Sequence, residues 1–372
     1  MENNESIFKK NKPKFAKDTN RLWFKELRKE AYKIVYEKSK TRQKEIYFKA
    51  FFFPFLFFLN YAAILYFGMN ISLFYFFNFL LGFTLVFVFL NIIHDAVHGT
   101  IFKTKWINKY YVYLFDLMGA NSYIWKIRHL YFHHNFPNVK DWDTDMEQNA
   151  LFRVFSHAPY KKHHKYQHLY VLPIYPIYLV NWLVYRDFRD FFAKDQIIHK
   201  WGKIPKFEFF RLIFFKGLFI FYTIIFPKYF LDLTWTQAFV GFAIYMVTAS
   251  IFALSILLTS HPNTEAIYPE VDEENKLPNT WFIHTLLTTN DVDMDNPFTR
   301  FMMGSFQFHV VHHLFPKINH VYYPEITEKL VEISEKYNLP YRKYTLGYAL
   351  KSHYQMLKEN GISPKELLEE AM

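Results

Sequence analysis

The chain has 372 residues, of which 51% are hydrophobic and 22% aromatic, and its formal net charge at pH 7 is +10. It contains no cysteine, which excludes disulfide bonds and thiolate metal sites. The mean hydropathy of −0.08 conceals a segregation of long apolar runs from charged stretches. No nucleic-acid recognition module accompanies the positive charge, so the composition favours a membrane protein and we expect no nucleic-acid partner.

The first 49 residues are basic and amphipathic. They carry 15 Lys and Arg side chains, and residues 20–46 present an apolar side that includes Leu22, Phe24 and Leu27. This pattern predicts a helix lying on the membrane surface. No small-residue cleavage site follows it, so we interpret the next apolar run as an anchor and not as a removable signal peptide.

Four apolar runs reach or approach the roughly 20 residues that cross a bilayer. They occupy residues 50–67, 71–93, 209–231 and 236–258. The sequence therefore predicts an all-α integral membrane protein with four transmembrane helices in two hairpins. The stretch at 169–184 is shorter and contains two prolines, and we predict that it is interfacial or re-entrant.

Lysine and arginine set the expected orientation. They are dense before the first run and almost absent from the two short links, which places both termini in the cytoplasm. The predicted organisation is a cytoplasmic N-terminal region (1–49), membrane hairpins (50–260) with a cytoplasmic insert (95–208), and a cytoplasmic helical C-terminal cap (261–372). Within the cap we expect a surface loop at 262–280 and helices at 324–337 and 364–371.

Histidines form the most informative pattern. Of 17 histidines, eight fall into three groups at spacings of one to five residues, and a ninth stands alone after the fourth run. The three groups are His94 and His98; His129, His133 and His134; and His309, His312 and His313, and the ninth residue is His261.

Residues three to five positions apart share a helix face, so each group can present imidazoles side by side. One four-coordinate site needs about four ligands, so the pattern predicts two metal ions held almost wholly by nitrogen. The number of predicted spans agrees with a shared centre, because the two spans between His134 and His261 leave all nine imidazoles on the cytoplasmic side. His284 is the alternative to His261 as the ninth ligand. The cluster His157, His163, His164 and His168 is expected to line an interface and not to bind metal.

Three aspartates lie close to these histidines. Asp95, Asp143 and Asp145 are candidates to orient ligand imidazoles through hydrogen bonds from the ring N–H. Helix capping or solvent exposure is the alternative for each.

The segments HDAVH (94–98), HLYFHH (129–134) and HVVHHLFP (309–316) resemble the three histidine boxes of the membrane fatty-acid desaturase superfamily. The segments HHNFPNVKDWDTDME (133–147) and HKYQHLY (164–170) resemble its acyl-CoA and acyl-lipid branch, which is related to front-end and linoleoyl-CoA desaturases. One desaturase domain would cover about 50–340. Two features depart from the fused front-end enzymes: no HPGG sequence occurs, and the third box begins with His309 in place of their usual Gln.

The resemblance implies that the nine histidines bind two iron ions, which zinc can replace in recombinant protein. The implied reaction uses O2 and two electrons to introduce a cis double bond into a fatty acyl chain. The implied partners are an acyl-CoA or acyl-lipid substrate, membrane lipid, and a separate electron donor, either ferredoxin or cytochrome b5 with its reductase. A membrane di-iron hydroxylase or ketolase stays open as the alternative, and a metal-binding transporter fits less well.

Overall fold

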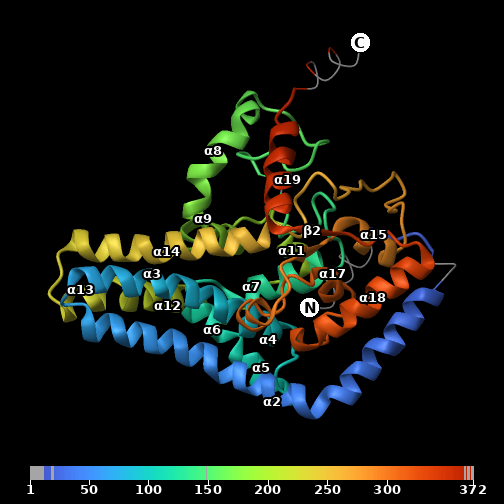
Figure 1. Cartoon of the computed structure of the whole chain (residues 1–372). Coiled ribbons are helices and arrows are strands. Elements are labelled where there is room, and N and C mark those ends of the chain that lie inside the picture. The colour runs from blue at the N-terminus through green and yellow to red at the C-terminus, as the bar shows by residue number, and fades with distance from the viewer. Residues whose placement is uncertain (1–11, 18–20, 148, 364–365, 367–368, 370–372) are drawn as a thin grey trace.

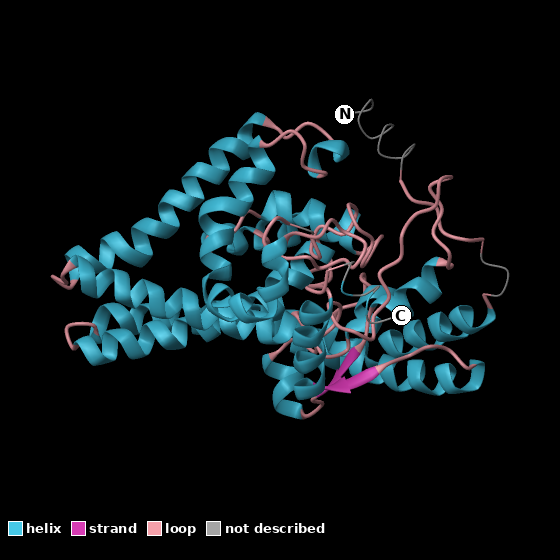
Figure 2. Ribbon diagram, turned by 90° about the horizontal axis from the view of Figure 1, so that it is seen from above, coloured by secondary structure: helices cyan, strands magenta, loops and turns pink. Residues whose placement is uncertain are grey.

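The computed structural model describes residues 12–17, 21–147, 149–363, 366 and 369. The regular structure of this part of the chain is almost wholly helical, with a single pair of three-residue strands. Long helices project from one side of the molecule, whereas loops, strands and most short helices gather on the other (Figure 1 and Figure 2). The predicted helical class is confirmed, and most of the helix predicted at 364–371 lies outside the described residues.

Four helical stretches are long and apolar enough to cross a bilayer, in agreement with the four predicted runs. They are α2 (Leu22–Phe67); the continuous stretch α3 (Ile71–Val88), η1 (Phe89–Ile93) and α4 (His94–His98); the continuous stretch α12 (Lys206–Ile220), η6 (Phe221–Ile225) and α13 (Phe226–Phe230); and α14 (Trp235–Leu257). Helix α3 packs against both α2 and α14.

Helix α2 corrects one prediction. The surface helix expected at 20–46 and the first span expected at 50–67 form one continuous helix of 46 residues. No glycine or proline lies between Leu22 and Phe53, so no residue in that stretch breaks the helix. Figure 1 shows α2 bent, and its N-terminal arm packs against α18 (Tyr323–Tyr337).

Two π-helical turns occur at the histidine boxes. Segment η1 ends directly before His94, and η2 (Arg128–His133) carries most of the second box. In η2 the N–H of His134 donates to the carbonyl of His129 at 3.0 Å, an i to i+5 bond. Such turns are rare and occur often at functional sites, because the extra residue per turn changes which side chains share a face.

The segment predicted to be interfacial or re-entrant is a broken series of short helices. It comprises α8 (Gln167–Ile174), η4 (Tyr175–Ile177), α9 (Tyr178–Asn181) and η5 (Trp182–Arg186). Pro173 lies inside α8 and Pro176 inside η4, which agrees with the short lengths of these elements. The segment is not among the four candidate spans.

The remaining elements surround the histidine boxes. Before α12 they are α5 (Lys105–Tyr111), α6 (Tyr113–Leu117), α7 (Ser122–Ile127), η3 (Lys162–Tyr166), α10 (Asp187–Phe192) and α11 (Ile198–Trp201). After α14 they are α15 (Trp281–Thr288), β1 (Asp291–Asp293), α16 (Pro297–Met302), α17 (His309–Leu314), η7 (His320–Tyr322), β2 (Lys343–Thr345) and α19 (Leu346–Glu359). The parallel strands β1 and β2 pair Asp291 with Lys343 and Asp293 with Thr345. The loop expected at 262–280 and the helix expected at 324–337 are both confirmed.

Candidate metal centre

Four segments that are distant in sequence bring the nine histidines together. Helix α4 supplies His94 and His98, π-turn η2 and its last residue supply the second box, α17 supplies the third, and His261 follows α14 in a loop. Eight of the nine are no more than 6% exposed, and His98 has intermediate burial.

The histidines form two groups, and each group draws from more than one box. The first contains His94, His98, His129 and His312, and the second contains His133, His261, His309 and His313. Within each group, one nitrogen per ring lies within 4.8 Å of every other. Spacing along the chain therefore does not decide which histidines share a group: the second and third boxes each contribute to both groups.

His134 lies between the two groups. Its Nε2 is 3.1 Å from Nε2 of His129 in the first group, and its ring centroid is 4.6 Å from that of His313 in the second. All nine histidines thus belong to one contiguous centre.

Within each group the ring nitrogens converge, as ligands of a shared metal ion would. In the first group, Nε2 of His94 and of His129 are 3.2 Å apart, and in the second, Nε2 of His261 is 3.0 Å from Nε2 of both His309 and His313. The buried Nε2 atoms of His98 and His312 have no hydrogen-bond partner. Burial lowers the pKa of His261 to about 3, which favours the neutral ring that binds metals.

Two of the three aspartates contact Nδ1 of a histidine ring, on the side away from the group. Oδ1 of Asp143 is 2.9 Å from Nδ1 of His133, and Oδ2 of Asp145 is 3.1 Å from Nδ1 of His129. Burial opposes charge on His133 and on Asp143, but their mutual attraction prevails, raising the pKa of His133 and lowering that of Asp143. A bond at Nδ1 fixes the ring so that Nε2 faces the group.

Asp95 does not act in this way, which corrects the expectation for that residue. Its Oδ2 accepts from Nδ1 of His320 at 2.6 Å and from Nδ2 of Asn319 at 2.7 Å. The reason is helix geometry: a residue next to His94 points about 100° away from it around the axis. Nε2 of His320 in turn lies 2.8 Å from the ammonium of the buried Lys49.

His284 lies outside both groups. Its Nε2 bonds to the carbonyl of Pro137 at 2.9 Å, whereas Nδ1 of His261 bonds to the carbonyl of Thr288 at 3.0 Å and leaves Nε2 facing the second group. Of the four histidines expected to line an interface, His164 is only 1% exposed. It is therefore an interior residue, and the expectation of an interface position is wrong for it.

Sequence reasoning missed two contacts of the centre. The hydroxyl of Tyr323 is 3.1 Å from Nδ1 of His312. Trp125 is 3% exposed and stacks on His129, with ring centroids 4.9 Å apart and planes 17° from parallel. Trp125 precedes His129 by four residues, so helical spacing could have indicated their contact.

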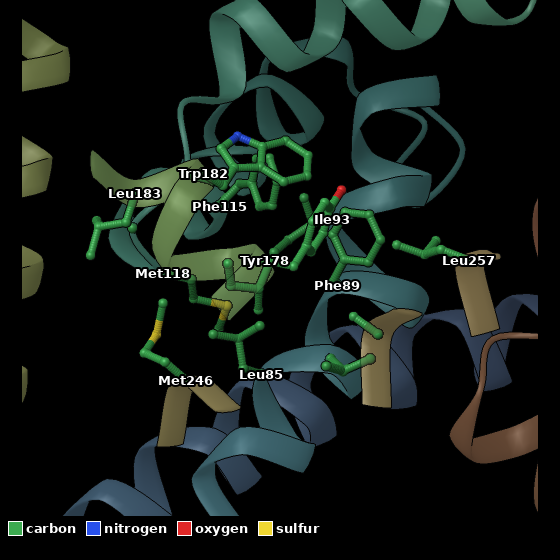
Figure 3. A pocket seen from close by; sticks show the side chains of 15 residues that line it. Leu85, Phe89, Ile93, Phe115, Met118, Tyr178, Trp182, Leu183, Met246 and Leu257 are labelled. Atoms are coloured by element: carbon green, nitrogen blue, oxygen red, sulfur yellow. The ribbon is translucent and has the colours of Figure 1, made fainter. Parts of the chain in front are cut away.

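An apolar pocket adjoins the first group. The space between its lining residues, open solvent included, is about 600 Å³, and its wall is almost wholly apolar. Phe89 and Ile93 come from the stretch that leads into α4, Met246 comes from α14, and Trp182 comes from η5 (Figure 3). Phe89 links pocket and centre, because its ring centroid is 6.4 Å from that of His94 and 5.3 Å from that of Trp125.

Comparisons with known proteins agree with this geometry. The family model described as "Fatty acid desaturase" matches residues 70–345. The sn-1 linoleoyl-lipid 6-desaturase of Arthrospira platensis is 28% identical over 286 residues, which cover 77% of each chain. The acyl-lipid (8-3)-desaturase of Physcomitrium patens is 28% identical over 82% of this chain and 64% of its own length. The match at residues 70–345 spans most of the chain and all three histidine boxes, and the chain belongs to the fatty acid desaturase family.

Proposed function

We propose that this chain introduces a cis double bond into a fatty acyl chain at a di-iron centre held by the nine histidines. The observation that carries the proposal is the pair of four-histidine groups, buried side by side with Nε2 atoms converging within each. That the chain is an oxidoreductase acting on fatty acyl chains follows from its family.

The reaction sets the requirements for the metal. Removing two hydrogens from adjacent methylenes balances as CH2–CH2 + O2 + 2 e⁻ + 2 H⁺ giving CH=CH + 2 H2O. Iron supplies the redox change and the binding of O2 that zinc cannot, and imidazole is a suitable ligand for it. His94, His98, His129 and His312 would hold one ion, and His133, His261, His309 and His313 the other, with His134 between them.

The remaining residues orient and shield the centre. Asp143, Asp145 and Tyr323 hold rings at Nδ1, so that Nε2 stays directed inward. Phe306 and Trp125 cover the histidines with apolar rings, at centroid distances of 4.5 Å from His309 and 4.9 Å from His129. We propose that the pocket behind Phe89 holds the acyl chain, since a wall almost without polar atoms excludes water and suits hydrocarbon.

The membrane arrangement extends the proposal. Four apolar helices would cross the bilayer as two hairpins, with both termini, the 95–208 insert and the cap at 261–372 in the cytoplasm. His94, near the end of one candidate span, and His261, four residues after another, would then lie on the cytoplasmic side, the side that the positive residues of 1–49 favour.

We further propose an acyl-lipid substrate and a separate electron donor, either ferredoxin or cytochrome b5 with its reductase. The names of the relatives support the carrier, because both relatives described above are named as acting on acyl lipids. The double-bond positions in the relatives' names are not carried over to this chain, and we propose that its own pocket sets the position.

Fatty-acid profiling of an expressing host tests the function. The host is compared with and without the chain, and with His133→Ala and His163→Ala variants at equal membrane levels. We expect a new unsaturated species with the wild type and with His163→Ala, whose exposed ring lies outside both groups. His133→Ala should yield none. Hydroxylated acyl chains in place of alkenes, or product from His133→Ala, would contradict the proposal.

A further inference from the structure

A lysine lies buried in a helix that is apolar enough to cross the membrane. Lys216 of α12 is 7% exposed, in a position where an ammonium group is expensive unless it is fully hydrogen-bonded. Its Nζ donates to Oδ2 of Asp187 at 2.6 Å, to the carbonyl of Gly119 at 2.6 Å and to the carbonyl of Trp182 at 3.4 Å. These three acceptors match the three protons of an ammonium group.

The carboxylate of Asp187 also has a hydrogen-bond partner at each oxygen. Because Asp187 belongs to α10, it adds a fourth segment to those that meet at the Lys216 ammonium. The carboxylate is 1% exposed. Its Oδ2 also accepts from the backbone N–H of Asn121 at 2.9 Å, and its Oδ1 accepts from Nε1 of Trp182 at 2.8 Å. The ion pair therefore joins α10 and α12 to the turn at 119–121 and to η5.

Two of the residues held by this ion pair line the apolar pocket. Gly119 and Trp182 belong to its wall, and Figure 3 shows the Trp182 indole beside Phe115. The indole is fixed on several sides: the Arg186 guanidinium lies 4.6 Å from the ring, and the Phe115 centroid is 5.9 Å away. Phe115 in turn is 4.9 Å from Trp125, the residue that stacks on His129.

We propose that the Lys216–Asp187 pair is a positioning device that fixes the Trp182 indole, and that Trp182 is a specificity-determining residue for the site of desaturation. This rests on the proposed function. A rigid wall fixes how far the acyl chain slides along the pocket, and hence which pair of carbons faces the histidine groups. Hydrophobic pockets discriminate a one-methylene difference by roughly 10–200-fold, so loss of one wall constraint should be visible in the products.

The test is the double-bond position in products made by a host expressing each variant. Trp182→Phe keeps an aromatic wall but removes the N–H that bonds to Asp187. Lys216→Met removes the ammonium. The matched control is Arg211→Met, because Arg211 lies on the same helix in an equally buried ion pair with Asp116 at 3.3 Å, and none of its partners lines the pocket.

We expect one dominant positional isomer from the wild type and from Arg211→Met. Trp182→Phe should raise a minor positional isomer by about tenfold, as the pocket discrimination above implies. Lys216→Met/Asp187→Leu removes both charges, so it should restore membrane levels relative to Lys216→Met alone, yet keep the altered isomer ratio, since the acceptor for Trp182 is gone.

Wild-type isomer ratios from both Trp182→Phe and the double variant would overturn the proposal. So would an equal isomer shift in Arg211→Met, which would mean that any buried ion pair of α12 has the same effect. A wild-type chain that makes no unsaturated product would overturn the proposed function, and this proposal with it.

Discussion

Replacing Asp143 by Asn should weaken metal binding in the second histidine group. Asp143 is 3% exposed, and its carboxylate accepts from Nδ1 of His133 at 2.9 Å and from the backbone N–H groups of Asn138, Asp145 and Met146 at 2.8, 2.9 and 3.1 Å. An amide has one acceptor oxygen where the carboxylate has two. With that oxygen toward Nδ1 of His133, the amide NH2 faces the N–H of Asn138, and His133 has a neutral acceptor in place of a charged one.

The magnitude follows from what such carboxylates do for a metal-bound ring. Loss of a partner to a ligand imidazole typically costs 10–100-fold in metal affinity, or about 1.4–2.7 kcal/mol. The cost should fall on the ion held with His133, while the group that contains His129 keeps its partner Asp145. We therefore expect one of the two dissociation constants to rise by that factor and the other to change little.

The assay is competition between the purified protein and a chelator of known affinity for iron(II). Asp141→Asn is the matched control, because Asp141 is an exposed residue of the same loop with φ of 63°, a conformation that Asn tolerates well. Equal affinities for wild type and Asp143→Asn, or an equal loss in Asp141→Asn, would refute the reasoning.

Three further outcomes are expected. His312→Ala should abolish product and remove one metal per chain at unchanged membrane levels, measured by elemental analysis, because its Nε2 belongs to the first group; two retained metals would contradict this. Burial raises the pKa of Asp291 to about 7. Between about pH 4 and pH 7 the folded state therefore keeps a proton that the unfolded state has released. The free energy of unfolding falls as the pH rises through this interval. The Tm of Asp291→Asn relative to the wild type should therefore rise between about pH 4 and pH 7 and level off above, and a difference that does not change with pH would contradict the shift. If electrostatics steer the donor to the basic chain, turnover at limiting donor should fall as salt shortens the screening length to about 8 Å, and salt-independent turnover would count against it.

The spans and boxes were predictable because their signals are local. A run of about 20 apolar residues needs no tertiary information to be recognised, and neither does a pair such as His94 and His98 on one helix face. The loop position of His261 after α14 was also accessible from the order of elements along the chain. The union of the surface helix and the first span in α2 was accessible in principle, since no breaker separates them.

The composition of each histidine group was not predictable from spacing. His133 and His129 lie four residues apart in η2 and yet serve different groups, because each meets partners from distant segments: His312 of α17 in one case and His261 in the other. The partner of Asp95 has the same origin, since His320 reaches it across 225 residues. Pocket residues such as Trp182 carry no sequence signal, because apolar and aromatic side chains are common throughout this chain for reasons unrelated to substrate.

The central claim is that two irons, one in each histidine group, together carry out the desaturation. The most direct measurement is the titration of metal-free protein with iron(II) in lipid nanodiscs, with donor, O2 and substrate in excess, and with product formed per chain as the readout. The geometry of two complete groups predicts that activity stays low through the first equivalent and reaches its maximum at two. A maximum at one equivalent, or full activity without iron, would contradict the account.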